Sequence, residues 1–335
     1  MKKSHRYNKF YHIFTKSWYL PQWWNFLLIP LSWVYHIVIL LRRALYQWGV
    51  FKQHSFPIPI IIVGNITVGG TGKTPLVIYL VEQLRAQGFR PAVISRGYGS
   101  KVKGVKAVHL DSSVKEVGDE PLLIKLRTDC PVFVASQREK AIAAILQNTD
   151  ANVIISDDGL QHYAINRDIE IVVLDGMRRF GNGLLLPAGP LRERIGRLNQ
   201  VDFVVNNGDE RTNEIMMSLA VDKLIHLKTN KSVSLAKFEG KEVRAIAGIG
   251  HPKRFFNTLI SQGIKVIPHA FPDHHFYRAS DLNFGDDLPI LMTEKDRIKC
   301  MHCVEDNMYY LTVKIDLPDA FIEQVLEKLV RLKVR

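Results

Sequence analysis

Cysteine is scarce in this 335-residue chain, and its scarcity excludes a class of protein. The three cysteines, Cys130, Cys300 and Cys303, cannot form the disulfide framework of a small secreted scaffold, and they fit a reducing compartment. His302 lies between the last two, but no second Cys/His pair has matching spacing, so no zinc site is predicted. Hydrophobic residues make up 47% and charged residues 23%, which with this length predicts a globular protein of two domains or one large one.

Negative charge is missing from the first quarter of the chain. No Asp or Glu occurs before Glu82, and nine of the twelve net positive charges lie in the first 81 residues. A nucleic-acid-binding protein more often clusters such charges on one folded face with interleaved aromatic residues. Here they flank an apolar segment, so the sequence predicts no nucleic-acid partner.

The apolar segment from Ser17 to Leu41 carries no formal charge and is rich in tryptophan and tyrosine. These residues favour the lipid headgroup boundary, and flanking lysines and arginines are attracted to anionic lipid. Two prolines divide the run, which leaves it short for a membrane span of about 20 apolar residues. We therefore expect residues 1–49 to form a membrane-associating segment with an interfacial or partly inserted helix, with a true span and a buried core helix as alternatives. The positive flanks predict that the main body lies at the cytoplasmic face.

A glycine-rich loop follows a short β-rich run that ends at Val63, and a helical pattern over 75–87 follows the loop. Glycines let successive backbone N–H groups point at phosphate oxygens, and the helix adds the positive end of its dipole. Lys73 is predicted to contact the β- and γ-phosphates of ATP, and the Thr74 hydroxyl to ligate Mg²⁺. Thr67 departs from the usual pattern, because it stands where the first glycine is expected. The predicted nucleotide-binding residues are Thr67, Gly69, Gly70, Thr71, Gly72, Lys73 and Thr74.

Two adjacent carboxylates, Asp157 and Asp158, end another apolar run that begins at Val153. Neighbouring carboxylates repel one another unless a cation is near. A phosphate loop also requires an acidic group at the end of another parallel strand to hold Mg²⁺ or its water. The pair therefore predicts a magnesium site next to the phosphate loop.

Strands alternate with helices along the rest of the chain. This order predicts an α/β fold with a parallel P-loop sheet covered by helices on both faces. Arg96 follows one strand, at the carboxyl end where ligand groups lie in such sheets, so it is a candidate for the phosphate or substrate environment, with a surface ion pair as the alternative. The expected strands are 92–95, 132–135, 169–174 and 201–206, with helices at 121–127 and 138–147.

A second, smaller α/β pattern begins after residue 225. Its expected strands are 243–247, 264–267, 290–292 and 309–313, with helices over 255–261 and 320–332. The predicted organisation is therefore a membrane-associating segment over 1–49, a P-loop nucleotide-binding domain over 50–225, and a smaller domain over 226–335 that closes over the active site.

Five further motifs follow in order along the chain: Gly118–Pro121, Asp157–His162, Pro187–Glu193, Phe271–His274 and Met292–Asp296. With the phosphate loop and these motifs, the chain resembles the tetraacyldisaccharide 4'-kinase family over nearly its whole length. The resemblance implies transfer of the γ-phosphate of ATP, with Mg²⁺, to the 4'-hydroxyl of an acylated glucosamine disaccharide 1-phosphate in lipid A biosynthesis. The acceptor is embedded in the cytoplasmic leaflet of the bacterial inner membrane, which accounts for the predicted anchor.

The resemblance also implies roles for single residues. Asp119 matches the family's catalytic carboxylate and His274 the histidine paired with it, although His275 stays open as the functional imidazole. The pair would remove a proton from the acceptor hydroxyl, and it would assemble only when the two domains close. The remaining implied residues are Arg192 and Glu193 for the phosphate and metal environment, and Gln161 and His162 for the acceptor side.

A membrane-recruited P-loop ATPase that acts as a switch or localisation factor is the main alternative. Both readings predict ATP binding and a membrane-seeking segment. They differ at the acceptor, because a switch hydrolyses ATP to water and has no use for the histidine motif of the second domain.

Overall fold

The computed structural model describes residues 16–20, 22–100 and 102–333. The basic residues before Lys16 belong to the predicted membrane-associating segment and lie outside these ranges, as does Pro21 within the apolar run. The sheet is built from the strands β1 Ile60–Gly64, β2 Pro91–Ser95, β3 Val105–Ala107, β4 Val132–Ala135, β5 Val153–Asp157, β6 Ile169–Asp175, β7 Phe203–Asn207, β8 Ile215–His226, β9 Ser232–Val233, β10 Glu242–Ala247, β11 Lys265–Ala270, β12 Ile290–Thr293 and β13 Met308–Asp316.

Helices connect most of these strands, as the alternating pattern predicts. They are α2 Trp24–Leu27, α3 Ile29–Gln47, α4 Lys73–Ala86, α5 Val114–Val117, α6 Asp119–Thr128, α7 Arg138–Asn148, α8 Pro252–Ser261, α9 Ala279–Leu282, α10 Glu294–Cys300 and α11 Asp319–Lys333.

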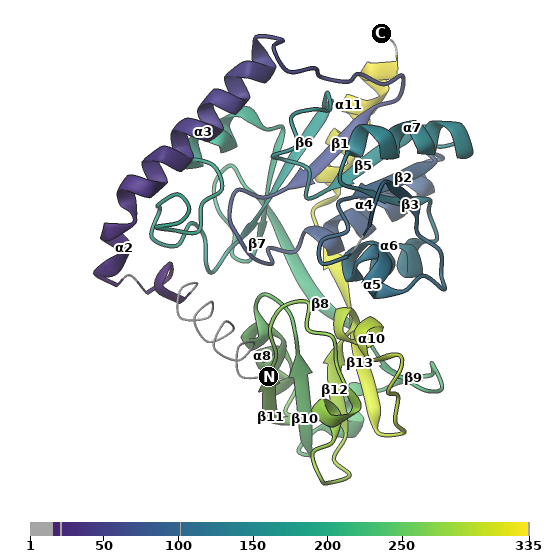
Figure 1. Cartoon of the computed structure of the whole chain (residues 1–335). Coiled ribbons are helices and arrows are strands. Elements are labelled where there is room, and N and C mark those ends of the chain that lie inside the picture. Colours follow the sequence, from purple (N-terminus) through teal and green to yellow (C-terminus); the bar gives the residue numbers. More distant parts are fainter. Residues whose placement is uncertain (1–15, 21, 101, 334–335) are drawn as a thin grey trace.

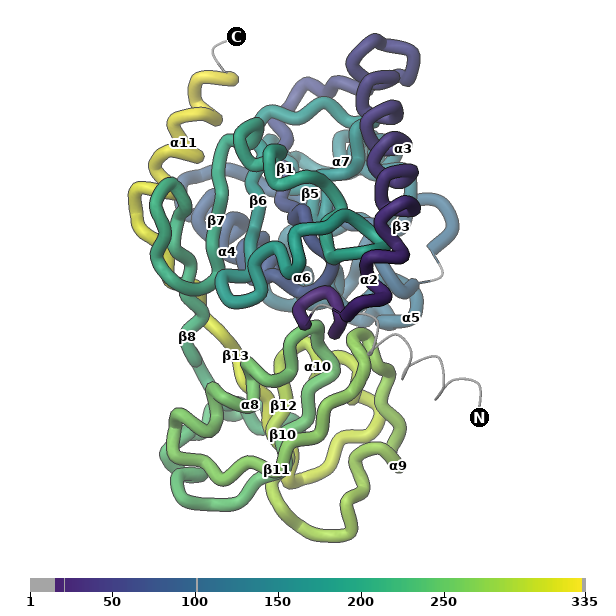
Figure 2. Tube along the Cα trace, turned by 90° about the vertical axis from the view of Figure 1, so that its left-hand side faces the viewer, coloured from purple at the N-terminus to yellow at the C-terminus, as the bar shows by residue number. Residues whose placement is uncertain are grey.

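The molecule has two lobes joined by two long strands (Figures 1 and 2). The strand order β11-β10-β12-β13-β8-β7-β6-β1-β5-β2-β4-β3 runs from the smaller lobe into the larger one, with β9 added beside β8. Neighbouring strands are parallel except where β3 meets β4 and where β8 meets β9 and β13. The α/β fold class with a parallel P-loop sheet and a smaller second part is confirmed.

The central strands of the larger lobe are buried on both faces. Every residue of β1, β5 and β6 is buried, which accounts for their nearly continuous apolar sequences. Val63 packs towards α4 in one core cluster, while Ile62 packs towards α7 in another. The sheet is therefore a rigid frame whose carboxyl ends carry the loops of interest.

The sequence analysis did not predict β8, which pairs with β7 at its start and with β13 further along. Most of its residues are half-buried or exposed, so it lacks the apolar run of a central strand. The predicted domain boundary after residue 225 falls inside this strand. The structure also differs in the placement of α11, which was assigned to the smaller part. Its apolar residues, among them Phe321 and Val325, pack into the core of the larger lobe beside α4.

Helix α3 lies along the outside of the larger lobe, on the side away from α11 (Figure 2). Polar side chains of α2 and α3 bind one loop of the larger lobe. Ser32 Oγ in α3 donates to Leu185 O at 2.9 Å, and Asn25 Nδ2 in α2 donates to Ala188 O at 3.1 Å. In the described ranges, no helix has both the length and the apolarity to cross a membrane. The interfacial placement of α3 therefore stays a prediction.

Candidate functional site

The phosphate loop is held in place by the segment that carries the Pro-Ala-Gly-Pro-Leu-Arg motif. Thr67 and Leu191 form an antiparallel bridge, and Arg192 N donates to Ile66 O at 2.7 Å. Val68 N donates to the carbonyl of the intervening proline at 2.9 Å. These bonds engage the backbone on either side of Thr67, whose side chain is buried.

Gly72 is the N-cap of α4, with a φ of 101° that residues other than glycine rarely adopt. A β-carbon at this position would lie 2.6 Å from the Asn207 side-chain nitrogen, which donates to Thr71 O at 3.0 Å. Asn207, at the end of β7, thus fixes the loop where Lys73 and Thr74 enter α4. Of the seven predicted nucleotide-binding residues, five lie in the loop between β1 and α4, and Lys73 and Thr74 are the first two residues of α4.

The two adjacent carboxylates have opposite surroundings. Asp157 is fully buried, and neither of its carboxylate oxygens has a hydrogen-bond partner within the described part of the chain. Asp158 pairs with Lys73 at 3.4 Å and with Arg192 at 3.1 Å. Burial, with the charge of Glu120 added, raises the pKa of Asp157. Burial also acts to raise the pKa of Asp158, but Lys73, Arg192 and other cations outweigh it and hold that pKa well below its usual range.

An unpartnered buried carboxylate beside a phosphate loop fits a divalent cation. Asp157 and Thr74 are the residues that would hold Mg²⁺, with phosphate oxygens and water completing its shell. Within the ranges that the structure describes, no three His, Cys, Asp or Glu side chains gather as a metal cage. A site built mainly from the nucleotide is consistent with that.

Arg138 positions the acidic pair, and the sequence analysis missed it. This buried side chain donates to Ser156 Oγ at 2.9 Å and to the carbonyls of Asp157 and Asp158 at 2.7 and 2.8 Å. Asp158 has a φ of 48°, and the arginine bonds stabilise that turn. Nothing in the local pattern of a helix-starting arginine indicates such a role.

The residues predicted for the substrate and phosphate environment lie around this turn. Gln161 donates to Glu193 Oε1 at 2.8 Å and to Asn65 O at 3.0 Å. Glu193 is further engaged by Tyr163 OH at 2.8 Å, so its carboxylate is directed to protein donors, and its metal role stays a prediction. His162 faces Glu139 at 3.4 Å, and burial lowers its pKa.

Arg96 is placed differently from these residues. It follows β2, as predicted, and its side chain is exposed. Neither an ion pair nor a hydrogen bond of its side chain is found within the described ranges. Its role therefore stays a prediction.

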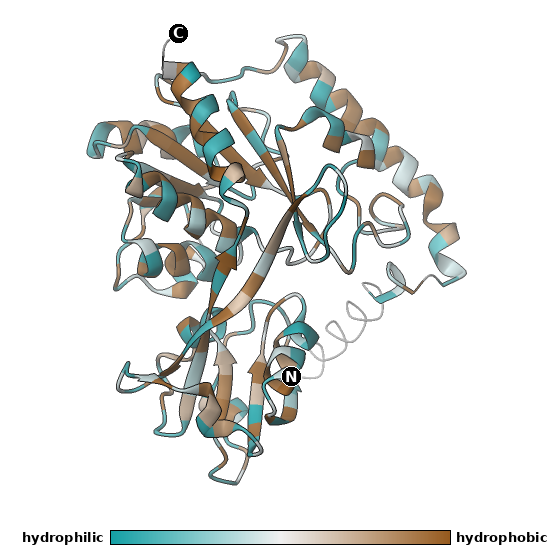
Figure 3. Cartoon of the chain, turned by 180° about the vertical axis from the view of Figure 1, so that it is seen from behind, coloured by the Kyte–Doolittle hydropathy of each residue, from teal (hydrophilic) through white to brown (hydrophobic). Residues whose placement is uncertain are grey.

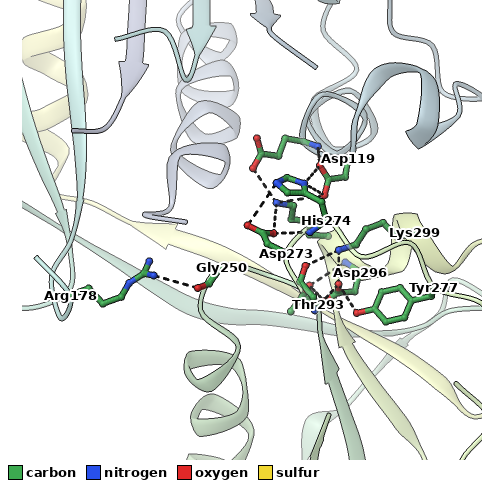
Figure 4. A network of polar contacts seen from close by, with 12 residues as sticks. Asp119, Arg178, Gly250, Asp273, His274, Tyr277, Thr293, Asp296 and Lys299 are labelled. Carbon is green, nitrogen blue, oxygen red and sulfur yellow. Dashed lines mark hydrogen bonds and ion pairs between the residues drawn. The ribbon is translucent and has the colours of Figure 1, made fainter. Parts of the chain in front are cut away.

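The structure brings Asp119 and His274 together across 155 residues of sequence. His274 Nδ1 lies 3.0 Å from Asp119 Oδ1 and 2.9 Å from Oδ2. Asp119 begins α6 and is 3% exposed, whereas His274 belongs to the loop after β11. His275 instead faces Asp281 at 3.1 Å. Of the two histidines, His274 is the one that contacts Asp119 (Figure 4).

A second contact between the lobes involves the phosphate loop itself. Arg178, in the loop directly after β6, donates to the carbonyl of Gly70. It also donates, at 3.4 Å, to the carbonyl of Gly250 (Figure 4). A β-carbon on Gly250 would lie 2.7 Å from Gly70 N, so the two backbones approach closely. Asp175 orients the arginine with an ion pair of 2.8 Å. Sequence patterns did not reveal Arg178, because its partners are backbone carbonyls far apart in the chain.

A buried polar network supports the loops of the smaller lobe (Figure 4). Asp296 Oδ1 accepts from Gly248 N at 3.1 Å and from Tyr277 OH at 3.0 Å. Lys299 pairs with the same carboxylate at 2.8 Å and donates to Gly248 O at 2.9 Å. Burial raises the pKa of Tyr277, so the phenol stays a donor.

Comparison with known proteins matches residues 24–330 to the family described as tetraacyldisaccharide-1-P 4'-kinase. The tetraacyldisaccharide 4'-kinase of Ruthia magnifica is 48% identical over 306 residues, which covers 91% of this chain and 97% of that protein. That of Nitrosococcus oceani is 45% identical over 318 residues, covering 95% and 94%. The chain belongs to the tetraacyldisaccharide 4'-kinase family.

The similarity to the tetraacyldisaccharide 4'-kinase family includes the three-dimensional fold. A crystal structure described as the "apo" form of LpxK from Aquifex aeolicus in complex with ATP superposes with a TM-score of 0.75 and 33% identity. The alignment covers 92% of this chain and 98% of that one. The resemblance inferred from the motifs is thereby confirmed, and a switch ATPase is not favoured.

Proposed function

We propose that this chain transfers the γ-phosphate of ATP to the 4'-hydroxyl of a tetraacylated glucosamine disaccharide 1-phosphate. The observation that carries the proposal is the Asp119–His274 pair, which joins the lobe of the phosphate loop to the other lobe. A switch that hydrolyses ATP needs no paired base for a sugar hydroxyl. The relatives' names supply the acceptor class, an acylated disaccharide.

The pair has the geometry of an oriented general base. Ionised Asp119 accepts the Nδ1 proton of His274, which leaves Nε2 as the nitrogen that takes a proton from the attacking hydroxyl. Lys73 and the loop amides bind the phosphates and offset their charge. When bound, Mg²⁺ neutralises phosphate charge; Asp157 and Thr74 are the ligands that we propose for it, with Asp158 close to Lys73.

We further propose that α2 and α3 bind the surface of an anionic membrane, at the cytoplasmic face of the bacterial inner membrane. One face of α3 is fixed to the larger lobe through Ser32 and through Tyr35, whose hydroxyl donates to Arg192 O at 3.3 Å. The opposite face is apolar, and Figure 3 shows hydrophobic residues along α3 in brown. It comprises Leu31, Trp33, Val34, Ile37, Val38, Leu40 and Leu41, each more than half exposed. A lipid acceptor accounts for such a surface close to the phosphate site.

Changing Trp33 and Ile37 together to aspartate should weaken binding to vesicles that contain anionic lipid, because both side chains are exposed and apolar. ATP binding should stay within about twofold of wild type, since neither residue belongs to the phosphate loop. Co-sedimentation with vesicles measures the first property and calorimetry the second. Val330→Asp, an exposed apolar position on α11, is the matched control and should not alter sedimentation. Equal sedimentation of the double variant and the wild type would contradict this membrane surface.

The transfer itself is tested with γ-labelled ATP and the acylated disaccharide 1-phosphate in detergent micelles. We expect label in the lipid fraction, dependent on Mg²⁺ and on the acceptor. Release of labelled inorganic phosphate at the same rate with and without acceptor would contradict the proposal and would favour a switch ATPase as the function.

A further inference from the structure

One lysine lies among three carboxylates at the junction of the two lobes. Lys295, in the first turn of α10, has its ammonium nitrogen 3.1 Å from Glu120 Oε1, 3.4 Å from Asp273 Oδ1 and 3.6 Å from Asp119 Oδ2. Its side chain is 17% exposed. Two of the carboxylates begin α6 in the larger lobe, whereas Asp273 directly precedes His274 in the smaller lobe.

We propose that Lys295 is a positioning residue for the transfer reaction: its ammonium group neutralises the carboxylates around it and so fixes the Asp119–His274 pair across the two lobes. The inference rests on the proposed function, and it adds a residue whose ion pairs, among the described residues, are with Asp119, Glu120 and Asp273.

The negative charges of Asp119, Glu120 and Asp273 require a cation at the position of Lys295. Three carboxylates gathered around one point repel one another, and an almost fully buried carboxylate without a cation takes up a proton. Burial acts to raise the pKa of Asp119, but Lys295 and the contact with His274 outweigh it and hold that pKa well below its usual range. In turn, Glu120, Asp119 and Asp273 hold the pKa of Lys295 well above its usual range, against the effect of burial.

Other groups near the pair do not replace this lysine. Lys299 also lowers the pKa of Asp119, but its ammonium group is committed to Asp296 and to Gly248 O. The Tyr98 ring packs on His274 with ring centroids 5.1 Å apart and brings no positive charge. Removal of Lys295 therefore leaves the Asp119 carboxylate, among the described residues, with the imidazole of His274 as its one remaining side-chain partner.

The helix that carries Lys295 is firmly anchored. Thr293 caps it, since its hydroxyl accepts from Asp296 N at 3.2 Å and donates to Asp296 Oδ2 at 2.6 Å. A separate ion pair, Arg127 with Glu294 at 2.8 Å, joins the same two helices, α6 and α10, away from Asp119. That pair offers a matched control, because its loss weakens the lobe contact without changing the charge beside Asp119.

The test compares Lys295→Met, Lys295→Arg and Arg127→Met by the pH profile of kcat for transfer to the lipid acceptor. In Lys295→Met we expect the acid limb, where proton uptake by the Asp119–His274 pair stops turnover, to move up by about one pH unit or more, which lowers the rate by at least about tenfold at pH values below both limbs. The KM for ATP should change by less than about twofold. Lys295→Arg and Arg127→Met should keep the wild-type limb. A Lys295→Met profile that is scaled down but not shifted would overturn the inference; if that variant does not fold, Lys295→Gln replaces it with the same expectation.

Stability supplies a readout that does not depend on the acceptor. When the pKa of an acid is higher in the folded protein than in the unfolded chain, the fold loses stability as pH rises through that raised pKa. An acid whose pKa is lower in the folded protein instead contributes stability that is present above its unfolded pKa. The urea midpoint of Lys295→Met should therefore fall further below wild type at pH 8 than at pH 5. An equal deficit at both pH values would overturn the inference even if wild type proved unable to phosphorylate the lipid, a result that would separately refute the proposed function.

Discussion

Replacing either Asp119 or His274 with alanine is expected to lower kcat by about 10²–10⁴, the usual contribution of a positioned general base. ATP affinity should barely change, because neither side chain belongs to the phosphate loop. The bond between His274 Nδ1 and the Asp119 carboxylate, at 2.9–3.0 Å, makes the two residues one unit. Single-turnover transfer with saturating ATP measures the effect on chemistry.

The double variant distinguishes one unit from two separate roles. Residues that act together are not additive, so the double variant should be little worse than the poorer single one. Losses that multiply would contradict the pair. His275→Ala is the control, because His275 is bound to Asp281 and stacked on Phe271, and it should keep at least about half of the wild-type rate. A loss as large as that of His274→Ala would reassign the functional imidazole.

Lys73→Ala is expected to lower kcat by at least about 10²–10³, because the lysine supplies charge for the phosphates during transfer. The fold should survive, since Asp158 keeps Arg192 at 3.1 Å after Lys73 is removed. Transfer assays give the rate, and the urea midpoint checks the fold. Lys140→Ala, at an exposed position of α7, is the matched control. Normal turnover by Lys73→Ala would contradict the phosphate-loop assignment.

The local parts of the site were predictable from sequence because they are short and contiguous. The phosphate loop and the acidic pair each combine a buried strand with the turn that directly follows it, so adjacent residues fix both position and chemistry. The same logic predicted α4, α6 and α7 to within a few residues. These elements bury apolar faces with clear periodicity, which is the signal that sequence carries best.

Long-range partners were not predictable in the same way. The Asp119–His274 pair was predicted from the family resemblance, because 155 residues separate the two residues and no spacing rule links them. Arg138, Arg178 and Lys295 act on groups that tertiary folding brings to them, and a single basic residue in a helix or loop has no distinguishing pattern. Strand β8 was missed for the related reason that a half-exposed strand lacks an apolar run.

The position of the new phosphate on the lipid tests the central claim most directly. The product of a reaction with wild-type protein, ATP, Mg²⁺ and the disaccharide 1-phosphate is isolated and examined by phosphorus–proton correlation NMR. The account predicts one added phosphomonoester, coupled to the proton at carbon 4' of the distal sugar, with one ADP formed for each. Phosphate on another hydroxyl, or ADP formed without a phosphorylated lipid, would contradict it.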